Sequence, residues 1–296
     1  MVYIMTKIAV ISTDNRVYGV NKALELLDFN PAKDKNVIFK PNFNTADPPP
    51  ASSSMETIKQ FIIKIKEMGA KSITVAERAG PANTSETFEK KGLYDLGKEL
   101  DFNIVDLTEI SDEEYVLKKP EGCHWKEGFL FAKIYDEAEC IIETCCLKTH
   151  MYGGHFTLSL KNAVGLVNKK NMGELHSSKD QRKMIAEINA AYKPDLIIMD
   201  GIISFVDRGP MEGTRKEANV FVAGTDKVAM DAVGVALLRI LGTTPEVTNG
   251  SIFDQAQIKR AVELNLGINS PDQIEFITDS EESVKLVVKI KEMLSG

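Results

Sequence analysis

The stretch NVIFKPNFN, Asn36–Asn44, decides the fold class of this chain. Its apolar run VIF predicts a buried strand, and Pro41 ends the strand because proline cannot donate a backbone hydrogen bond. An amphipathic segment with helical spacing follows at Thr57–Met68, and SITVAERAG, Ser72–Gly80, then repeats the strand design. Strands that alternate with helices in this way predict an α/β fold, with a mostly parallel sheet flanked by helices.

The same alternation continues on both sides of this stretch. KIAVIST, Lys7–Thr13, and DLIIMDG, Asp195–Gly201, are strand-like runs, and Lys227–Leu241 has the spacing of a helix. We therefore expect a single domain over residues 1–296, or two β-α lobes, 1–135 and 136–296, that share a cleft.

Charge and the start of the chain limit the class of protein. The net charge is -7 and the lysines are scattered, whereas a nucleic-acid partner requires Lys and Arg clustered on one face. The opening MVYIMTKIAVIST is too short to span a membrane and lacks the basic start and cleavage site of a signal peptide. We expect a cytoplasmic protein with neither nucleic acid nor membrane as a partner.

Polar residues follow the two strands that define the fold. Lys40, Asn42 and Asn44 come at the end of the first strand, and Glu77 comes with Arg78 at the end of the second. Ligands of open α/β sheets bind at the carboxyl ends of the strands. The sequence therefore predicts that these side chains line a ligand site.

A third strand end lies in LKTHMYGGHFTLSLKNAVG, Leu147–Gly165, where costly polar groups interrupt an apolar segment. Lys148 and His150 would emerge where the strand ends. A glycine-rich turn at Gly153 and Gly154 that opens a helix would offer free N–H groups to an anion. The site would gain a further positive charge from Lys161 and an amide from Asn162.

A second group of candidates lies towards the carboxyl terminus. Asp200 follows a strand-like run and could be a base, a ligand or a helix N-cap, and Gly209 and Gly213 lie in the loop after it. Asp226 could cap the next helix. Asp231 lies inside that helix, where a structural role explains it less well.

The histidines leave a metal site open as an alternative. His150 and His155 are five residues apart, not the four that place two histidines on one helix face for zinc. The two histidines could still meet across the turn, and Glu77, Asp200 or His176 could then supply the third ligand of a divalent metal.

The cysteines do not follow the spacing of a cluster site. Cys123, Cys140, Cys145 and Cys146 lack the C-x2-C-x2-C pattern of a ferredoxin, and buried free cysteines pack as small apolar residues. We expect no iron–sulfur cluster in this chain.

Five motifs carry a resemblance to a known family: KPNFN, LKTH with TLSLKNAVGLV, GELH, DLIIMDGI with RGPMEG, and AGTDKVAMDAVG. Together they resemble the family called domain of unknown function 362 over about Val37 to Leu241. The resemblance implies a cytoplasmic prokaryotic protein. Motif positions of the family are occupied by Lys40, Asn42, Lys148, His150, Lys161, Asn162, His176, Asp200, Gly209, Pro210, Gly213, Asp226 and Asp231.

The resemblance also bears on cofactors and partners. Relatives are often fused to a ferredoxin-like module with four-iron clusters, which suggests an iron–sulfur redox partner, although this sequence shows no such module. His155 does not clearly match the family pattern, which favours His150 with His176 as the metal pair. In its α/β build the family is also distantly similar to nickel-dependent lactate racemases, a likeness of fold only.

The sequence favours an enzyme that performs acid–base chemistry on a small anionic metabolite, a carboxylate or a phosphate. The lysines would hold the anion, and the candidate catalytic residues are His150, Asp200 and Glu77. The alternative is a non-catalytic metal- or redox-handling protein working with iron–sulfur partners. A third interpretation is a scaffold in which the conspicuous polar residues only cap and bridge helices.

Overall fold

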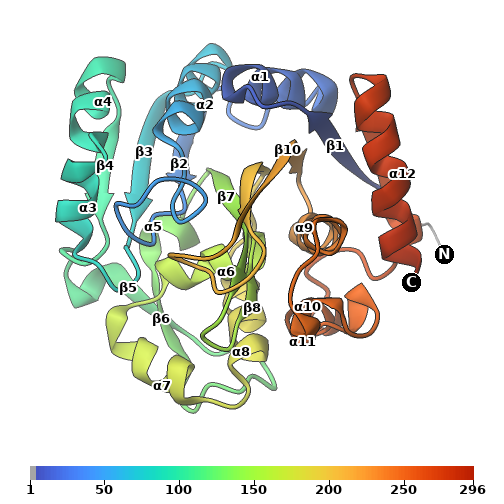
Figure 1. Ribbon diagram of the computed structural model, residues 1–296. Coiled ribbons are helices and arrows are strands. Elements are labelled where there is room, and N and C mark those ends of the chain that lie inside the picture. Colours follow the sequence, from blue (N-terminus) through green and yellow to red (C-terminus); the bar gives the residue numbers. More distant parts are fainter. Residues whose placement is uncertain (1–4) are drawn as a thin grey trace.

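A nine-stranded sheet organises the computed structural model, which describes residues 5–296 (Figure 1). The strands run in the order β11-β1-β10-β9-β7-β2-β3-β4, and β8 pairs with β7 at the side of this path. Their bounds are β1 Thr6–Ser12, β2 Asn36–Lys40, β3 Ser72–Glu77, β4 Asn103–Asp106, β7 Cys140–His150, β8 His155–Thr157, β9 Leu196–Phe205, β10 Arg215–Gly224 and β11 Ile274–Thr278.

Most neighbouring strands of this sheet are parallel, which confirms the predicted α/β fold. Strands β9, β7, β2, β3 and β4 run parallel to one another, as do β1 and β11, whereas β10 runs antiparallel to both β1 and β9, and β8 runs antiparallel to β7. Because β1 lies between β10 and β11, strands from the first and last parts of the chain share one sheet. The division into lobes 1–135 and 136–296 stays a prediction.

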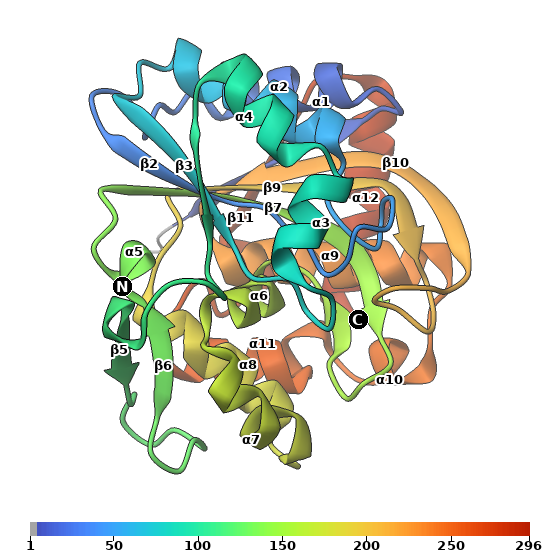
Figure 2. The ribbon, with the colours of Figure 1, turned by 90° about the vertical axis from the view of Figure 1, so that its left-hand side faces the viewer.

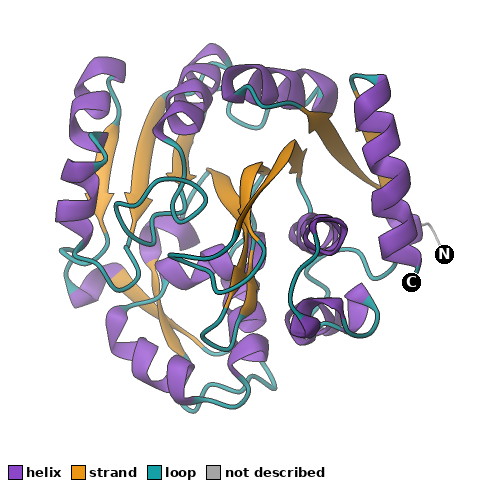
Figure 3. Ribbon diagram, viewed as in Figure 1, coloured by secondary structure: helices purple, strands orange, loops and turns teal. Residues whose placement is uncertain are grey.

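Helices cover both faces of the sheet (Figure 3). The buried apolar residues of the first four helices pack on one face of the sheet. Cys140 and Ile142, at the start of β7, point to the same face. The remaining helices pack on the opposite face. The first set is α1 Arg16–Leu27, α2 Met55–Glu67, α3 Thr84–Lys90 and α4 Leu93–Leu100; the second is α5 Lys133–Asp136, α6 Ser159–Asn162, α7 Met172–Ser177, α8 Gln181–Ile188, α9 Lys227–Leu241, α10 Pro245–Thr248, α11 Ala256–Glu263 and α12 Glu281–Ser295.

Helix α2 shows how the sequence produces these elements. Ser54 caps its start by accepting a hydrogen bond from Glu56 N at 3.2 Å, as expected of serine at an N-cap. Its apolar residues recur at helical spacing, and Ile58, Phe61 and Ile65 are fully buried against the sheet.

A small hairpin lies apart from the main sheet (Figure 2). Strands β5, Tyr115–Lys118, and β6, Phe129–Ala132, are antiparallel and pack with α7 and α8 in a cluster that includes Trp125. Its isolated bridge from Phe131 to Val167 ties the hairpin to the segment that follows α6.

Two local expectations were wrong. The turn at Gly153 and Gly154 does not open a helix, because it joins β7 to the antiparallel strand β8, and α6 begins only at Ser159. Asp200 does not end its strand, because β9 continues to Phe205.

None of the helices in residues 5–296 combines the length and the apolar composition that a membrane crossing requires.

Candidate functional site

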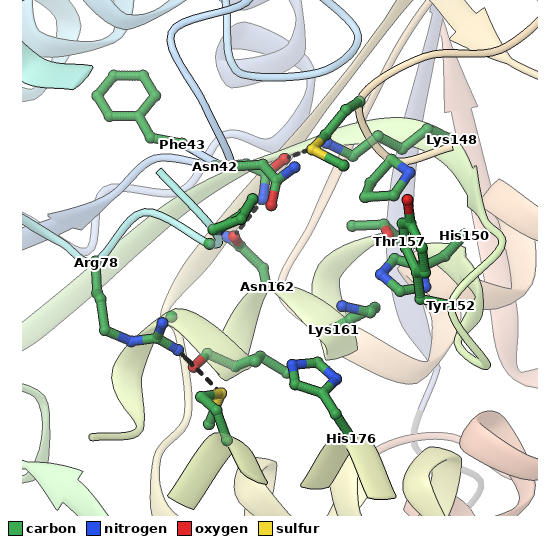
Figure 4. Close-up of a pocket in the computed structure, with 18 of the residues that line it drawn as sticks. Asn42, Phe43, Arg78, Lys148, His150, Tyr152, Thr157, Lys161, Asn162 and His176 are labelled. Atoms are coloured by element: carbon green, nitrogen blue, oxygen red, sulfur yellow. Dashed lines mark hydrogen bonds between the residues drawn. The ribbon is translucent and has the colours of Figure 1, made fainter. Parts of the chain in front are cut away.

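A pocket of about 840 Å³ lies where β2, β3 and β7 end (Figure 4). Ten of the residues expected from the sequence line it, and they come from four separate segments of the chain. This is the edge of the sheet at which ligands of α/β proteins bind. The ten residues are Lys40, Asn42, Asn44, Glu77, Lys148, His150, Gly153, Lys161, Asn162 and His176.

The floor of the pocket holds a buried ion pair between neighbouring strands. Lys40 Nζ lies 2.6 Å from Glu77 Oε2, and it also donates to Pro41 O at 2.7 Å and to Asn162 Oδ1 at 3.1 Å. Burial raises the pKa of the Glu77 carboxyl, and the nearby ammonium opposes that shift. An ammonium group has three donors, so Lys40 has none left for a ligand.

Two amides continue this network to a second lysine. Asn42 Nδ2 donates to Asn162 Oδ1 at 3.2 Å, and Asn42 Oδ1 accepts from Lys148 Nζ at 2.9 Å. Lys148 Nζ also donates to Ala51 O at 2.6 Å, which leaves one of its donors free. Burial lowers the pKa of Lys148 to about 8.

Lys161 differs from the other two lysines because its ammonium stands alone. It lies in α6 and lines the pocket, and within residues 5–296 its ammonium forms no hydrogen bond or ion pair. Burial lowers its pKa to about 7, and the positive charge of Lys148 adds to this shift.

Beside Lys161, two polar atoms are buried without a partner. These are His150 Nδ1 and Thr157 Oγ1, and Lys148 pairs with Thr157 across the β7–β8 hairpin. Burial lowers the pKa of His150 far below its ordinary value, and Lys161 lowers it further, so the imidazole is neutral. The ring of Tyr152 lies 5.8 Å from the His150 ring at the pocket edge.

The Gly-Gly turn allows these groups to come together. A Cβ atom at Gly154 would lie 2.9 Å from His150 Nδ1 and 3.0 Å from Lys161 Cε, closer than almost any real Cβ contact. Gly153 has φ +80°, a conformation that glycine adopts without strain. The two side chains therefore share the space that a larger residue would occupy.

His176 enters the pocket from α7. Its Nδ1 lies 3.1 Å from Gln181 Nε2, and burial lowers its pKa, with further contributions from Lys161 and Arg78. Residues 5–296 contain no group of three His, Cys, Asp or Glu side chains arranged to hold a metal ion. A metal on His150 and His176 stays a prediction.

Asp200 lies outside the pocket lining. Its carboxylate accepts from Arg16 Nε at 3.0 Å and from Thr57 Oγ1 at 2.7 Å, on helices α1 and α2. The Asp200 side chain therefore points to the face of the sheet that α1 and α2 cover, and not into the pocket.

Asp226 and Asp231 also lie outside the pocket lining. Asp226 caps α9 by accepting from Ala229 N at 2.9 Å, the structural role open to it from the sequence. Asp231 is fully buried and accepts from Leu160 N at 3.1 Å and from Gln257 Nε2 at 3.1 Å. It therefore holds the start of α6, the helix that carries Lys161.

The two loop glycines take separate positions. Gly209 packs against Thr149, and the residue after it, Pro210, lines the pocket. Gly213 lies against Asp207 and does not line the pocket.

Comparison with known proteins gives the family. The chain matches the family model called Domain of unknown function (DUF362) over residues 37–236. It belongs to this family. The matched range contains every residue of the pocket.

Two relatives extend the comparison of this DUF362 protein. The thylakoid-associated protein sll1697 of Synechocystis sp. is 26% identical over 211 residues, which are 69% of this chain and 63% of that protein. The match therefore spans less than two thirds of the relative. The lactate racemase apoprotein of Thermoanaerobacterium thermosaccharolyticum has a TM-score of 0.50 and 14% identity, covering 94% of this chain and 85% of that chain, which shows a shared fold.

Arg78, the residue expected at the strand end with Glu77, lines the pocket of this DUF362 protein, and its guanidinium donates to Val167 O at 3.0 Å and Val164 O at 2.7 Å. Other pocket residues were not among the sequence-based candidates. Thr157 would have followed from predicting the β7–β8 hairpin, which brings it opposite Lys148. Met172 and Gln181 carry no local signal, because they come from segments distant in the chain.

The cysteines of the DUF362 chain do not line the pocket. Cys140, Cys145 and Cys146 are buried and Cys123 is partly buried, and all four are free thiols. Burial raises the pKa of the Cys145 thiol well above its ordinary value, which disfavours the thiolate that binds metals.

Proposed function

We propose that this protein is an enzyme that binds a small carboxylate metabolite in the pocket and transfers a proton to or from it. The single observation that carries the proposal is the Lys161 ammonium, half-buried in the pocket beside His150 without an anionic partner among residues 5–296. A charge withdrawn from water is costly unless it is paired, so a site of this kind favours an anionic ligand.

The free donors define how the carboxylate would bind. One donor of Lys148, the ammonium of Lys161 and the hydroxyl of Thr157 remain available after the contacts within the protein are counted. These groups would fix the carboxylate by charge-assisted hydrogen bonds. The same positive charges would stabilise negative charge that develops on the substrate during proton removal.

Two groups could move the proton. Lys161 has a pKa of about 7, and a general acid or base works best when its pKa is near the operating pH. His150 is neutral with a strongly lowered pKa, so it could accept a proton only when the negative charge of a bound carboxylate raises that pKa. We assign Glu77 a supporting role, because its contacts with Lys40 and Phe43 N occupy the carboxylate.

The structural relative supports the type of chemistry without supplying the residues. A lactate racemase acts on a small hydroxy acid, and we extend acid–base chemistry on a carboxylate to this chain only as part of the proposal. The cytoplasmic location and an iron–sulfur redox partner stay predictions.

A metal-handling function is the second candidate. It draws on the unpartnered Nδ1 of His150 and on His176 in the same pocket. Elemental analysis of the purified protein, with the double change His150→Ala and His176→Ala as control, tests it. A stoichiometric metal that the double variant loses would favour this second function.

Thermal unfolding with added anions tests the binding part of the proposal. A carboxylate at a hundred times its dissociation constant should stabilise the protein by about 2.7 kcal/mol. Lys148→Met and Lys161→Met keep most of the apolar stem and should abolish the gain. Lys98→Met is the control, because Lys98 is 81% exposed and outside the pocket.

The result that contradicts the proposal is equal stabilisation of the parent and both pocket variants by the same anion. Proton transfer is tested separately, by following the exchange of substrate C–H for deuterium in heavy water with each carboxylate that stabilises the protein. A ligand that binds without any exchange would leave a binding protein and remove the catalytic claim.

A further inference from the structure

We infer that the ligand is an elongated carboxylate with an apolar body, and not a short acid. The inference rests on the proposed function, because it assumes that the carboxylate binds at Lys148 and Lys161. It adds the substrate class that the rest of the pocket would accept.

The size of the pocket is the first reason. Its volume of about 840 Å³ lies in the range of roughly 300–1,000 Å³ that is typical of pockets for drug-sized ligands. A short acid such as propionate would fill a small part of this space, and water would occupy the rest.

The distribution of polar groups is the second reason. Lys148, His150, Thr157 and Lys161 gather on one side of the pocket, and Arg78 lies across from them (Figure 4). The unpartnered donors and acceptors at this side include His150 Nδ1 and Thr157 Oγ1. The ligand therefore has its polar end at this side.

The opposite side holds a cation whose donors are mostly used within the protein. The Arg78 guanidinium is buried and donates to Val164 O, Val167 O and Ala79 O, and Arg78 Nη2 lies 3.3 Å from Met172 Sδ, which leaves one of its five donors free. Its hydrogen bonds hold the loop after α6 in place. The lining also includes Lys169, which is exposed to solvent.

Apolar side chains make up much of the rest of the lining. Val164 and Met172 come from the segment after α6, Met211 from the β9–β10 loop and Pro81 from the loop after β3, and we call these four residues the apolar wall. Methionine is unbranched and polarizable, so each methionine adapts to apolar groups of different shape. The apolar wall thus fits an alkyl or aromatic body attached to the carboxylate.

Binding measurements with four probes test this inference: propionate, hexanoate, 3-phenylpropionate and 3-phenylpropionamide. We expect hexanoate or 3-phenylpropionate to bind at least about tenfold more tightly than propionate, because each added methylene in a fitted apolar pocket contributes about tenfold or more. The neutral amide should bind at least about tenfold more weakly than its acid, because it cannot form the charge-assisted bonds.

Two single variants locate the apolar wall. Met172→Ser and Met211→Ser should each weaken binding of the longer acid about fivefold or more and weaken propionate binding less, since each removes apolar surface, and Met172→Ser also removes the Sδ contact with Arg78. Leu117→Ser is the control, because Leu117 is 59% exposed and outside the pocket. The melting temperature of each variant shows whether it folds. If one variant does not fold, the other still tests the inference.

The outcomes separate the inference from the proposed function. Propionate binding as tightly as both longer acids overturns the inference and leaves the function standing. Amide and acid binding equally, with both tighter than propionate, supports the apolar body and overturns the carboxylate function. Unchanged binding of the longer acid in both methionine variants also overturns the inference.

Discussion

Lys40 Nζ lies 2.6 Å from Glu77 Oε2, and the two side chains are each 1% exposed. The pair joins the ends of two neighbouring parallel strands, β2 and β3. Gly165 packs directly on it, since an added Cβ would lie 2.5 Å from Glu77 Oε1. The pair therefore fixes both strand ends and the segment after α6 around the pocket.

Replacing Glu77 tests the structural importance of this pair. Glu77→Gln keeps the shape but leaves the Lys40 charge buried without its partner, which should cost about 3–5 kcal/mol of unfolding free energy. Urea unfolding at neutral pH measures the loss. Glu99→Gln is the matched control, because the Lys59–Glu99 pair is about half exposed and should cost under about 1 kcal/mol. Equal costs in both variants would contradict the assigned role.

Lys161 should make the stability of the protein depend on pH. Its pKa is lowered to about 7, so between about pH 7 and 10 the unfolded chain holds a proton at this residue that the folded chain has released. Stability of the parent therefore rises with pH through this window. Lys161→Met should be more stable than the parent at pH 7, and the difference should shrink towards pH 10.

Chemical unfolding of both proteins from pH 6 to 10 measures this difference. Lys98→Met, at an exposed site, serves as control and should follow the parent at every pH. A constant difference for Lys161→Met would mean that the residue titrates normally in the folded protein.

Gly154 should be essential for the arrangement of His150 and Lys161. Gly154→Ala places a methyl group 2.9 Å from His150 Nδ1 and 3.0 Å from Lys161 Cε, so one of these side chains must move. We expect the fold to persist and carboxylate stabilisation to be lost, as measured by thermal unfolding with and without ligand. Gly173→Ala is the control, because nothing lies within 4 Å of its added methyl group. Undiminished binding by Gly154→Ala would show that the pocket does not depend on this close approach.

Asp231 should make the stability of the protein fall as the pH rises, the opposite of the effect of Lys161. Burial raises its pKa to about 7, so between about pH 4 and 7 the unfolded chain releases a proton that the folded chain retains. This residue therefore lowers stability as pH rises through that window. Asp231→Asn cannot ionise and should become more stable relative to the parent from pH 4 to 7, by up to about 1.4 kcal/mol per pH unit.

The surroundings of Asp231 allow this substitution. Gln257 Oε1 is buried without a partner, so a turn of the Gln257 amide would let it accept from the new side-chain amide. Asp95→Asn, at a position 89% exposed, is the control in the same urea titrations. A falling difference between pH 4 and 7 would contradict the raised pKa.

The sequence by itself determined the α/β class and three of the strand ends that meet at the pocket. Alternating strand and helix patterns imply parallel strands, and the carboxyl ends of parallel strands lie on one edge of the sheet. Lys40, Glu77 and Lys148 could therefore be placed near one another from local patterns alone.

Only the tertiary structure decided which of the predicted polar groups are free to act. Asp200 lies within β9, which runs on to Phe205, so its side chain shares a face with Ile198 and Ile202 and points to α1 and α2; the length of the strand depends on its neighbours. All three donors of Lys40 have acceptors, whereas the Lys161 ammonium has none in the described part of the chain. Segments far apart in the chain supply these acceptors, as Asn162 does for Lys40. Local sequence specifies the strand and helix patterns, whereas hydrogen-bond partners and burial are set by packing between distant segments, and these decide the chemistry of the pocket.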